Sequence, residues 1–327
     1  MKRLVSLALV VTAGLLGLEA ASHPLEAGWR GQSGRIAFVT RLGDPAVQQV
    51  YTMNPDGSDV RQLTMSEGTN STPFWSPDGS RIAFAREVDG DFEIYVMNAD
   101  GSGQTPITDN SADDFSPTWS PDGTRIVFAT NRDGSAQHIY VMGADGSNPQ
   151  PLTESTSNDY DPVWSPLGNQ IAFTRAVVAP FGFEIFVMDA NGENETSVTD
   201  LDDGPASEPD WKPDGSLLAF AGARDPDVPG GADVWTIRPD GSDQQRVTNQ
   251  NCGVQPAWAP DAARITYACF EGTDSRVWVI GANGTDPTSI TTGPSDQEPN
   301  WQPILAPPPP PSPPVLAPLL AQPTFTG

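Results

Sequence analysis

The chain has 327 residues, and its 42 acidic against 17 basic residues give a formal charge of −25 at pH 7. Such a charge repels phosphate backbones and anionic lipid headgroups, so we expect no nucleic-acid partner and no membrane insertion. His23 and His138 are the only histidines, which argues against histidine-ligated zinc and against a histidine base.

The first 22 residues have the pattern of a secretory signal peptide. Lys2 and Arg3 precede an apolar stretch at 4–18, and the small residues at 20–22 fit a cleavage site. The apolar stretch is shorter than the about 20 residues that span a bilayer. We therefore expect an exported chain, periplasmic or secreted, in which residues 23–33 lead into the first domain.

From residue 34 to residue 303 one pattern repeats every 43 to 47 residues. Its anchor is a tryptophan with a proline two residues before and two residues after it, at Trp75, Trp119, Trp164, Trp211, Trp258 and Trp301. Each tryptophan is followed by apolar runs rich in Ile, Val, Phe and Tyr, which are bounded by Pro, Asp or Gly as in short strands joined by tight turns. We predict an all-β, six-bladed propeller with four antiparallel strands in each blade.

The chain enters this pattern at a second strand, residues 35–38, and leaves it after a tryptophan strand, residues 298–303. We predict that the two remnants form one blade, so that the C-terminal strand around Trp301 closes blade 1. Closure removes the open sheet edges of the ring. One tryptophan per blade at a fixed register also fits packing between adjacent blades.

The only two cysteines, Cys252 and Cys269, flank the hairpin that begins with the tryptophan strand of blade six, around Trp258. A turn at 260–263 places Cys269 nearly opposite residue 254, within a residue or two of Cys252. We predict a disulfide, which suits an oxidising compartment. The alternative is two unpaired small apolar residues.

Residues 304–327 form a proline-rich tail, with seven prolines among the nine residues 306–314. Such a segment favours the polyproline II conformation. We predict a disordered spacer, and the alternative is a docking ligand for an aromatic groove.

The motif Trp-Ser-Pro-Asp-Gly, followed by Arg-Ile-Ala-Phe and later by Ile-Tyr-Val-Met-Asn-Ala-Asp-Gly, closely resembles the repeat of the TolB-type propellers. The resemblance covers residues 34–303 and implies the propeller fold. TolB has a separate N-terminal domain before its propeller, which we do not expect in this chain. Leu167 and Ala262 depart from the Asp and Gly of the repeated turn.

Acidic residues occur in two settings. Seven precede a glycine in a tight turn, where a carboxylate bonds the local backbone: Asp56, Asp78, Asp100, Asp122, Asp145, Asp214 and Asp240. Others, including Asp114 and Asp159, lie in segments that lead from one blade to the next. Strand alternation places these segments on one face, around the mouth of the channel.

A polar side chain stands three residues before each tryptophan, at Thr72, Ser116, Asp161, Glu208, Gln255 and Glu298. We expect these six rim residues to surround the axis and, together with Asp114 and Asp159, to form the ligand-binding site. Three carboxylates and three neutral donors suit basic groups of a ligand, or a hard cation such as Ca²⁺ in the central channel. A solvated polar rim is the third interpretation.

No catalytic residue can be assigned, because neither histidine is placed beside a nucleophile and no G-x-S-x-G elbow occurs. We predict a non-catalytic, monomeric scaffold without a required cofactor, which binds a protein or peptide partner in the cell envelope through its acidic channel mouth. The alternative is a Ca²⁺-dependent propeller enzyme that acts on a lactone or a carbohydrate.

Overall fold

The computed structural model describes residues 34–41, 47–134, 136–178, 181–200, 202, 204–222 and 231–303. The chain divides into two compact units, Met1–Gln32 and Ser33–Gly327, and every described residue belongs to the second. The expected signal peptide (1–22), the lead-in (23–33) and the proline-rich tail (304–327) lie outside the described residues.

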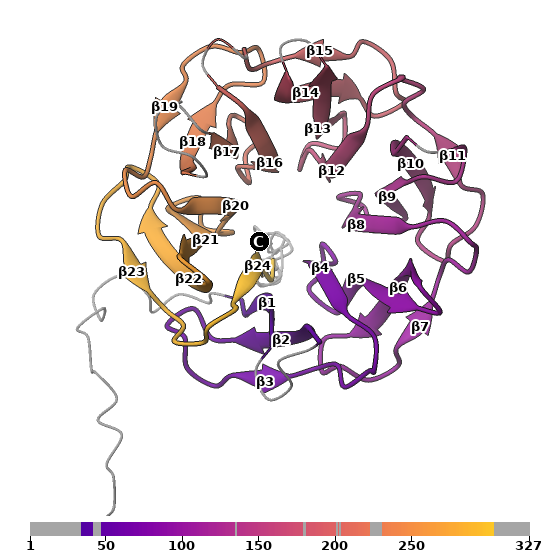
Figure 1. The fold of residues 1–327 in the computed structure, drawn as a ribbon, viewed down its shortest axis with the longest axis horizontal. Coiled ribbons are helices and arrows are strands. Elements are labelled where there is room, and N and C mark those ends of the chain that lie inside the picture. Colours follow the sequence, from indigo (N-terminus) through magenta and orange to yellow (C-terminus); the bar gives the residue numbers. More distant parts are fainter. Residues whose placement is uncertain are drawn as a thin grey trace, which may run out of the picture. The chain divides into compact units, whose positions relative to one another are not determined.

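The described residues form 24 strands in six four-stranded sheets, arranged as the blades of one propeller (Figure 1). The innermost strands, each ending at a repeat tryptophan, are β24 (Gln297–Trp301), β4 (Asn70–Trp75), β8 (Asp114–Trp119), β12 (Asp159–Trp164), β16 (Ala206–Trp211) and β20 (Gly253–Trp258). The second strands are β1 (Ile36–Thr40), β5 (Arg81–Val88), β9 (Arg125–Thr130), β13 (Gln170–Val178), β17 (Leu218–Gly222) and β21 (Arg264–Glu271).

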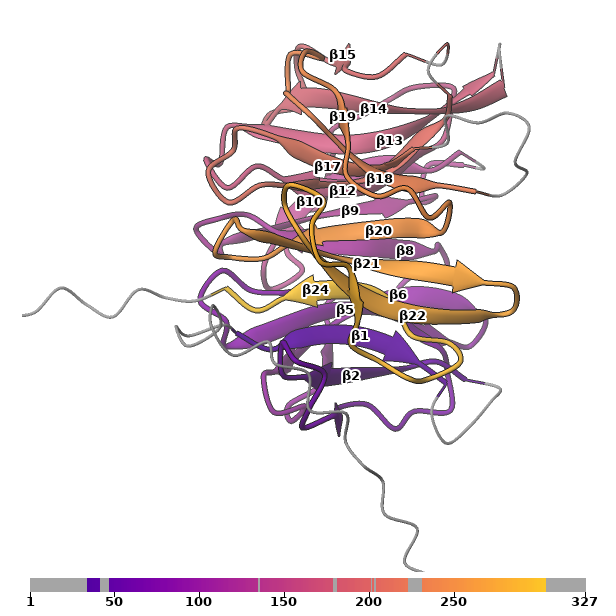
Figure 2. The same ribbon diagram turned by 90° about the vertical axis from the view of Figure 1, so that its left-hand side faces the viewer.

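The outer half of each blade consists of a third strand and a very short fourth one. The third strands are β2 (Gln49–Met53), β6 (Asp91–Asn98), β10 (His138–Gly143), β14 (Phe181–Asp189), β18 (Asp233–Ile237) and β22 (Asp274–Gly281). The fourth strands are β3 (Arg61–Gln62), β7 (Thr105–Pro106), β11 (Gln150–Pro151), β15 (Thr196–Ser197), β19 (Gln245–Arg246) and β23 (Thr288–Ser289). Figure 2 shows the blades from the side, with the long strands running from one face of the ring to the other.

Blade 1 is closed by the C-terminal strand, as the sequence predicts. The order of its sheet is β24-β1-β2-β3, and β24 pairs antiparallel to β1 with Trp301 opposite Ile36. Beyond this pairing, Gln302 donates its backbone N–H to the Arg35 carbonyl at 2.7 Å, and Arg35 donates its own to Gln302 Oε1 at 2.9 Å. The two ends of the propeller are therefore joined by backbone and side-chain hydrogen bonds.

The six repeat tryptophans pack between blades, which confirms the role predicted from their register. Their exposed fractions lie between 1% and 6%. Trp164 of blade 4, for example, shares a buried cluster with Phe173 of its own blade and with Val127 and Ile139 of blade 3. The Arg125 guanidinium of blade 3 also stacks 4.5 Å from the centroid of the Trp164 ring. Each tryptophan thus joins its own blade to the preceding one.

The repeated turns explain much of the acidic composition. In the turn after Trp75, Asp78 Oδ1 accepts hydrogen bonds from the hydroxyls of Ser76 and Ser80 at 2.6 and 2.8 Å and from the Ser80 backbone N–H at 3.0 Å. The hydrogen bond from Ser76, with further ones from Ser80, lowers the pKa of Asp78 to about 2. The same contacts to Oδ1 recur at Asp122. These carboxylates stabilise tight turns, as predicted.

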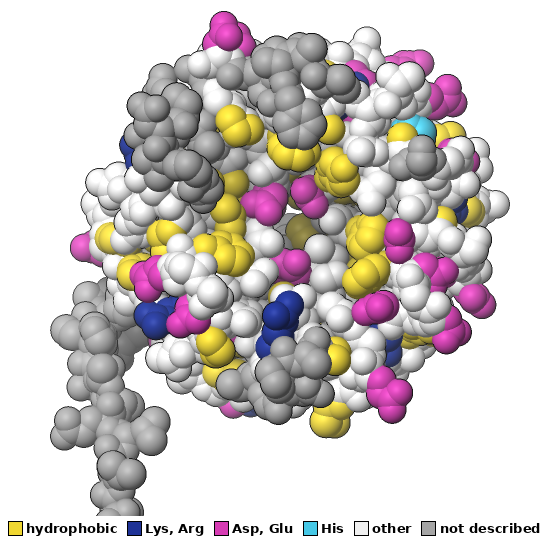
Figure 3. All heavy atoms as spheres, viewed as in Figure 1, with side chains coloured by type: hydrophobic (Ala, Val, Ile, Leu, Met, Phe, Trp, Pro, Cys, Tyr) yellow, Lys and Arg dark blue, Asp and Glu magenta, His cyan; other side chains and the backbone are white. Residues whose placement is uncertain are grey.

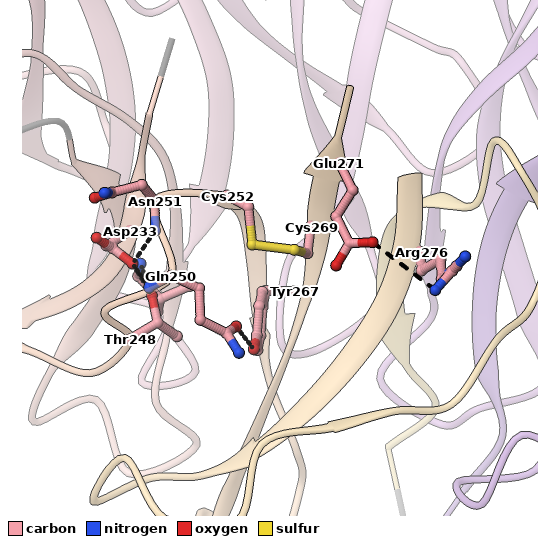
Figure 4. The surroundings of a disulfide bond; sticks show 10 residues. Asp233, Thr248, Gln250, Asn251, Cys252, Tyr267, Cys269, Glu271 and Arg276 are labelled. Atoms are coloured by element: carbon pink, nitrogen blue, oxygen red, sulfur yellow. Dashed lines mark hydrogen bonds and ion pairs between the residues drawn. A yellow bond between two sulfur atoms is a disulfide. The ribbon is translucent and has the colours of Figure 1, made fainter. Parts of the chain in front are cut away.

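The predicted disulfide is present between Cys252 and Cys269 (Figure 4), with the two Cα atoms 4.6 Å apart. The register is one residue from the expected one, because Cys269 of β21 lies opposite Gly253. Asp233 of the preceding blade also holds this loop, since its Oδ1 accepts hydrogen bonds from the Thr248 hydroxyl and from the backbone N–H of Asn251. The loop before β20 is thus attached both to its own blade and to blade 5.

Reduction of this disulfide is expected to lower the free energy of unfolding by about 3 kcal/mol, because the bond closes a loop in the unfolded chain. The sequence separation of the two cysteines is 17. Urea denaturation with and without reductant measures the effect, and a Cys252→Ala/Cys269→Ala variant should match the reduced protein. Coincident denaturation curves, or two thiols that alkylate without reductant, would contradict the prediction.

Candidate functional site

A β-bulge in each innermost strand sets the position of the rim residues. The pairing of β12 with β13, for instance, shifts register between Tyr160 and Val163. In every blade the residue at the shift has a positive φ: Thr72 48°, Ser116 49°, Asp161 48°, Glu208 57°, Gln255 52° and Glu298 54°. Positive φ is uncommon for residues other than glycine, and a bulge re-aims the side chain of its strand.

The structure brings all six rim residues together, since they line a single cavity of about 170 Å³ in the channel. Figure 3 shows acidic side chains gathered around the central hollow of this face, with hydrophobic side chains beside them. Among the described residues that line the cavity, none is Lys, Arg or His. The carboxyl groups of this cavity therefore have no basic partner among the described residues that line it.

Hydrogen bonds between neighbouring blades join the rim residues. Glu208 Oε2 accepts the backbone N–H of Gln255 at 2.8 Å, and Gln255 Oε1 accepts that of Glu298 at 3.0 Å. Glu298 in turn accepts the backbone N–H of Thr72, and the Ser116 hydroxyl donates to Asp161 at 3.0 Å. These contacts use one oxygen of each carboxyl group. The rim carboxyl groups therefore also hold neighbouring blades together.

The surrounding protein raises the pKa of the channel carboxyl groups. Burial, with a smaller contribution from the nearby Asp161 charge, raises the pKa of Glu208 to about 8 and that of Glu298 to about 7. Burial also raises the pKa of Asp161 itself. At neutral pH the site therefore holds protons that an incoming positive charge would displace.

Stability is expected to fall as pH rises from about 4.5 towards 8. Because the folded-state pKa of Glu208 lies above the unfolded value of 4.5, the folded chain binds more protons than the unfolded chain within this window. Glu208→Gln should therefore flatten the profile and stabilise the protein at pH 8 by on the order of 2 kcal/mol, which is less than the full pKa shift implies because Glu208 keeps part of its surface exposed.

Urea denaturation at pH 5 and pH 8 tests this prediction, with Asp240→Asn as the matched control. Asp240 lies in an exposed turn between β18 and β19, where the Ser242 hydroxyl lowers its pKa. The control variant should keep the fall in stability between the two pH values. An unchanged pH profile in Glu208→Gln would be evidence against the prediction.

Asp114 and Asp159 do not belong to the rim, and this part of the sequence prediction is corrected. Both are fully buried. Arg132 Nη2 lies 3.0 Å from both carboxylate oxygens of Asp114, while Arg175 contacts Asp159 through Nε at 2.6 Å and Nη2 at 2.9 Å. Residues two apart face the same side of a regular strand, but the positive φ at Asp161 breaks that alternation. Asp159 consequently points into the blade while Asp161 lines the channel.

Two channel residues were missed by sequence reasoning: Asp210 and Asn300. Each directly precedes a repeat tryptophan and accepts the backbone N–H of the tryptophan in the next blade, Asp210 from Trp258 at 2.6 Å and Asn300 from Trp75 at 3.0 Å. Burial raises the pKa of Asp210 to about 7. The only signal in the sequence is a polar residue at a position where other blades have Phe, Thr, Val or Ala.

Within the part of the chain that the structure describes, no group of three or more His, Cys, Asp and Glu side chains is close enough to hold a metal ion. Ca²⁺ in the channel stays a prediction. The Nε2 atom of His138 contacts the Ser155 carbonyl at 2.8 Å, away from the rim residues. None of the described residues forms a helix long and apolar enough to cross a membrane.

Comparison with known proteins identifies relatives of this propeller. The family model described as TolB beta propeller domain matches residues 25–206. The Tol-Pal system protein TolB of Anaeromyxobacter dehalogenans is 40% identical over 120 residues, which cover 36% of this chain and 26% of that protein. Dipeptidyl-peptidase 5 of Porphyromonas gingivalis is 32% identical over 59 residues, 18% of this chain and 9% of that protein. The chain thus spans only a small part of these curated relatives.

Among solved structures, TolB from Acinetobacter baumannii superimposes with a TM-score of 0.71 at 20% identity, covering 83% of this chain and 67% of that one. At this identity the likeness shows the fold alone. The family model, however, matches more than half of the chain. The chain therefore belongs to the TolB β-propeller domain family.

Proposed function

We propose that the protein is an exported, non-catalytic scaffold that binds a protein or peptide partner of the cell envelope through its acidic channel mouth. The observation that supports this most is the cavity in which Asp161, Glu208 and Glu298 meet without a basic residue among its lining. A lysine or arginine side chain, or an N-terminal amine, would supply the missing positive charge. Charge complementarity of this kind favours selective and rapid association.

Aromatic side chains beside the rim offer the apolar contacts that such a partner needs. Phe115, next to Ser116, packs against Phe92 with ring centroids 4.9 Å apart, and Tyr160, next to Asp161, packs against Phe183 at 6.2 Å. All four side chains are only partly buried. Half-exposed aromatic rings around a charged centre are typical of interface anchors.

Capture from an envelope extract by the immobilised protein tests the proposal. Asp161→Ala and Glu208→Ala are expected to lose the captured partner, and binding should weaken as salt rises because the charges are screened. Asp240→Asn, which removes an exposed turn carboxylate outside the rim, is the matched control and should retain the partner. Equal capture by the rim variants and the parent would contradict the proposal and would mean that the partner binds another face of the propeller.

The alternative proposal is a Ca²⁺-dependent enzyme for a lactone or a carbohydrate. Four carboxyl groups in one cavity, those of Asp161, Glu208, Asp210 and Glu298, are the observation in its favour. Melting temperatures with EDTA and with added Ca²⁺ distinguish the two proposals. A rise with Ca²⁺ that is lost in Glu298→Gln would support the metal site, whereas indifference to both additions would argue against the enzyme.

A further inference from the structure

A turn of one kind joins the third strand of each blade to its fourth strand. Because neighbouring strands are antiparallel, the third strand runs in the same direction as the innermost strand and ends, like it, away from the rim. In four of the six turns the residue before the turn glycine is an aspartate: Asp56, Asp100, Asp145 and Asp240. Asn191 and Asn283 stand at this position in the other two, and they are the only asparagines of the chain that precede a glycine. Both are exposed, so water reaches them.

An asparagine followed by glycine can lose its side-chain amide without an enzyme, because glycine has no side chain to hinder the reaction. The backbone nitrogen of the glycine attacks the side-chain carbonyl carbon, and the new C–N bond closes a five-membered succinimide ring. The side-chain nitrogen leaves as ammonia, with the proton of the attacking nitrogen. Water then opens the ring to aspartate or to isoaspartate. Negative charge develops on the side-chain oxygen during the attack, so hydrogen-bond donors that point at this oxygen stabilise the transition state.

The two asparagine turns have the same backbone geometry. Gly192 and Gly284 have φ values of 87° and 81°, and each donates its N–H to the carbonyl three residues earlier, at 2.9 and 2.8 Å. The side-chain oxygen of each asparagine accepts the backbone N–H two residues later, at 3.2 Å for Asn191 and 3.3 Å for Asn283. The attacking nitrogen and the exposure of the reacting amide are therefore matched between the two sites.

A hydroxyl group distinguishes the two turns. Thr285 donates its hydroxyl to Asn283 Oδ1 at 2.8 Å, in addition to its backbone N–H. Glu193 stands at the equivalent place after Asn191, and it has only its backbone N–H to donate to that oxygen. The oxygen on which charge develops thus has two hydrogen-bond donors in the turn of blade 6 and one in the turn of blade 4.

The aspartate that results from this reaction fits the turn. Asp240 Oδ1 already accepts the same two kinds of donor, the hydroxyl of Ser242 at 2.6 Å and its backbone N–H at 3.0 Å. Isoaspartate would instead lengthen the main chain by one carbon next to Gly284. That glycine packs so closely against the Val247 carbonyl that an added Cβ would lie 2.8 Å from its oxygen. The folded turn therefore accommodates aspartate and leaves no room for isoaspartate.

We propose that Asn283 is a site of spontaneous deamidation in the folded protein, and that the Thr285 hydroxyl makes it react faster than Asn191. Conversion to aspartate adds one negative charge at the end of blade 6 away from the rim. It also gives this blade the Asp-Gly turn that four other blades have. The reaction does not depend on the function proposed for the rim.

Incubation of the folded full chain at pH 8, followed by peptide mapping with mass spectrometry, measures both rates in one sample. Asn283 should deamidate roughly fivefold faster than Asn191, the factor that corresponds to one neutral hydrogen bond. Thr285→Ala should bring Asn283 to the rate of Asn191, whereas Thr285→Ser, which keeps the hydroxyl, should retain the faster rate. In urea, which removes the turns, the two asparagines should react at similar rates.

Each comparison has a result that would overturn the proposal. Equal rates in the folded chain would mean that the hydroxyl does not stabilise the transition state. A difference that persists in urea would assign the effect to the neighbouring sequence instead of the turn. An unchanged rate in Thr285→Ala, with a native circular dichroism spectrum, would exclude the hydroxyl as the cause. Isoaspartate at position 283 in chains that keep the native spectrum would contradict the fit of the product.

Discussion

A chain that ends at residue 296 is expected to lack a folded propeller. The deletion removes β24, which is the innermost strand of blade 1 and contacts the blades on both sides. Trp301 donates its indole N–H to Thr266 of blade 6 at 3.0 Å, and Glu298 accepts the backbone N–H of Thr72 in blade 2. Loss of β24 would expose the edge of β1 and the buried face of blade 6 together. Near-UV circular dichroism and thermal unfolding measure the effect.

A chain that ends at Pro303 is the control for this deletion. It keeps β24 and the hydrogen bonds between Arg35 and Gln302, so it should unfold cooperatively like the full chain. If the chain ending at residue 296 also shows a cooperative transition and a native near-UV spectrum, blade 1 does not need its innermost strand.

Asp159→Ala is expected to cost about 3–5 kcal/mol of stability, the usual penalty for removing one partner of a buried ion pair. The carboxylate is fully buried and holds the guanidinium of Arg175, which also stacks 5.0 Å from Phe173 and 4.8 Å from Phe186. Without Asp159, the positive charge stays among aromatic rings with Glu195 as its remaining carboxylate contact. Urea denaturation at pH 7 gives the free-energy difference.

Asp161→Ala is the matched control for this prediction, because Asp161 lies two positions after Asp159 in the same strand. Asp161 lines the channel and has no ion-pair partner among the described residues, so its removal should change stability by less than about 1 kcal/mol. A double Asp159→Leu/Arg175→Met variant should recover most of the loss, since it replaces both charges by apolar groups. Similar losses in the two single variants would contradict the assignment of Asp159 to the blade interior.

The propeller and its closure could be predicted because they depend on local, repeated chemistry. A tryptophan between two prolines, followed by an Asp-Gly turn, determines where a strand ends and where the next begins. The disulfide was predictable for the same reason, since one hairpin fixes the distance between its cysteines. The error of one residue in its register shows the limit of counting along two strands, because β20 contains a bulge between Val254 and Ala257.

The candidate site was predictable only in part. Equivalent positions in six blades must surround the axis, so the ring of Thr72, Asp161 and their equivalents followed from the repeat. The positive φ at these positions was not visible in the sequence, and without it Asp159 and Asp161 are expected on the same side of the strand. A second cavity of about 340 Å³, lined by the repeat tryptophans and by the prolines two residues after them, was not predicted, because the tryptophans were assigned only to packing between blades.

Because hydrogen bonds join Arg35 to Gln302, the first and last residues of the ring lie side by side. The blades can therefore keep their places in space if the chain starts in a different blade. Linking residues 34 and 303 directly and opening the chain within another blade would preserve every strand pairing of the ring. The resulting circular permutant would close a different blade with its terminal strands. The arrangement of the blades therefore does not depend on which blade contains the two ends of the ring, and permutants opened in any of the six blades should form the same propeller.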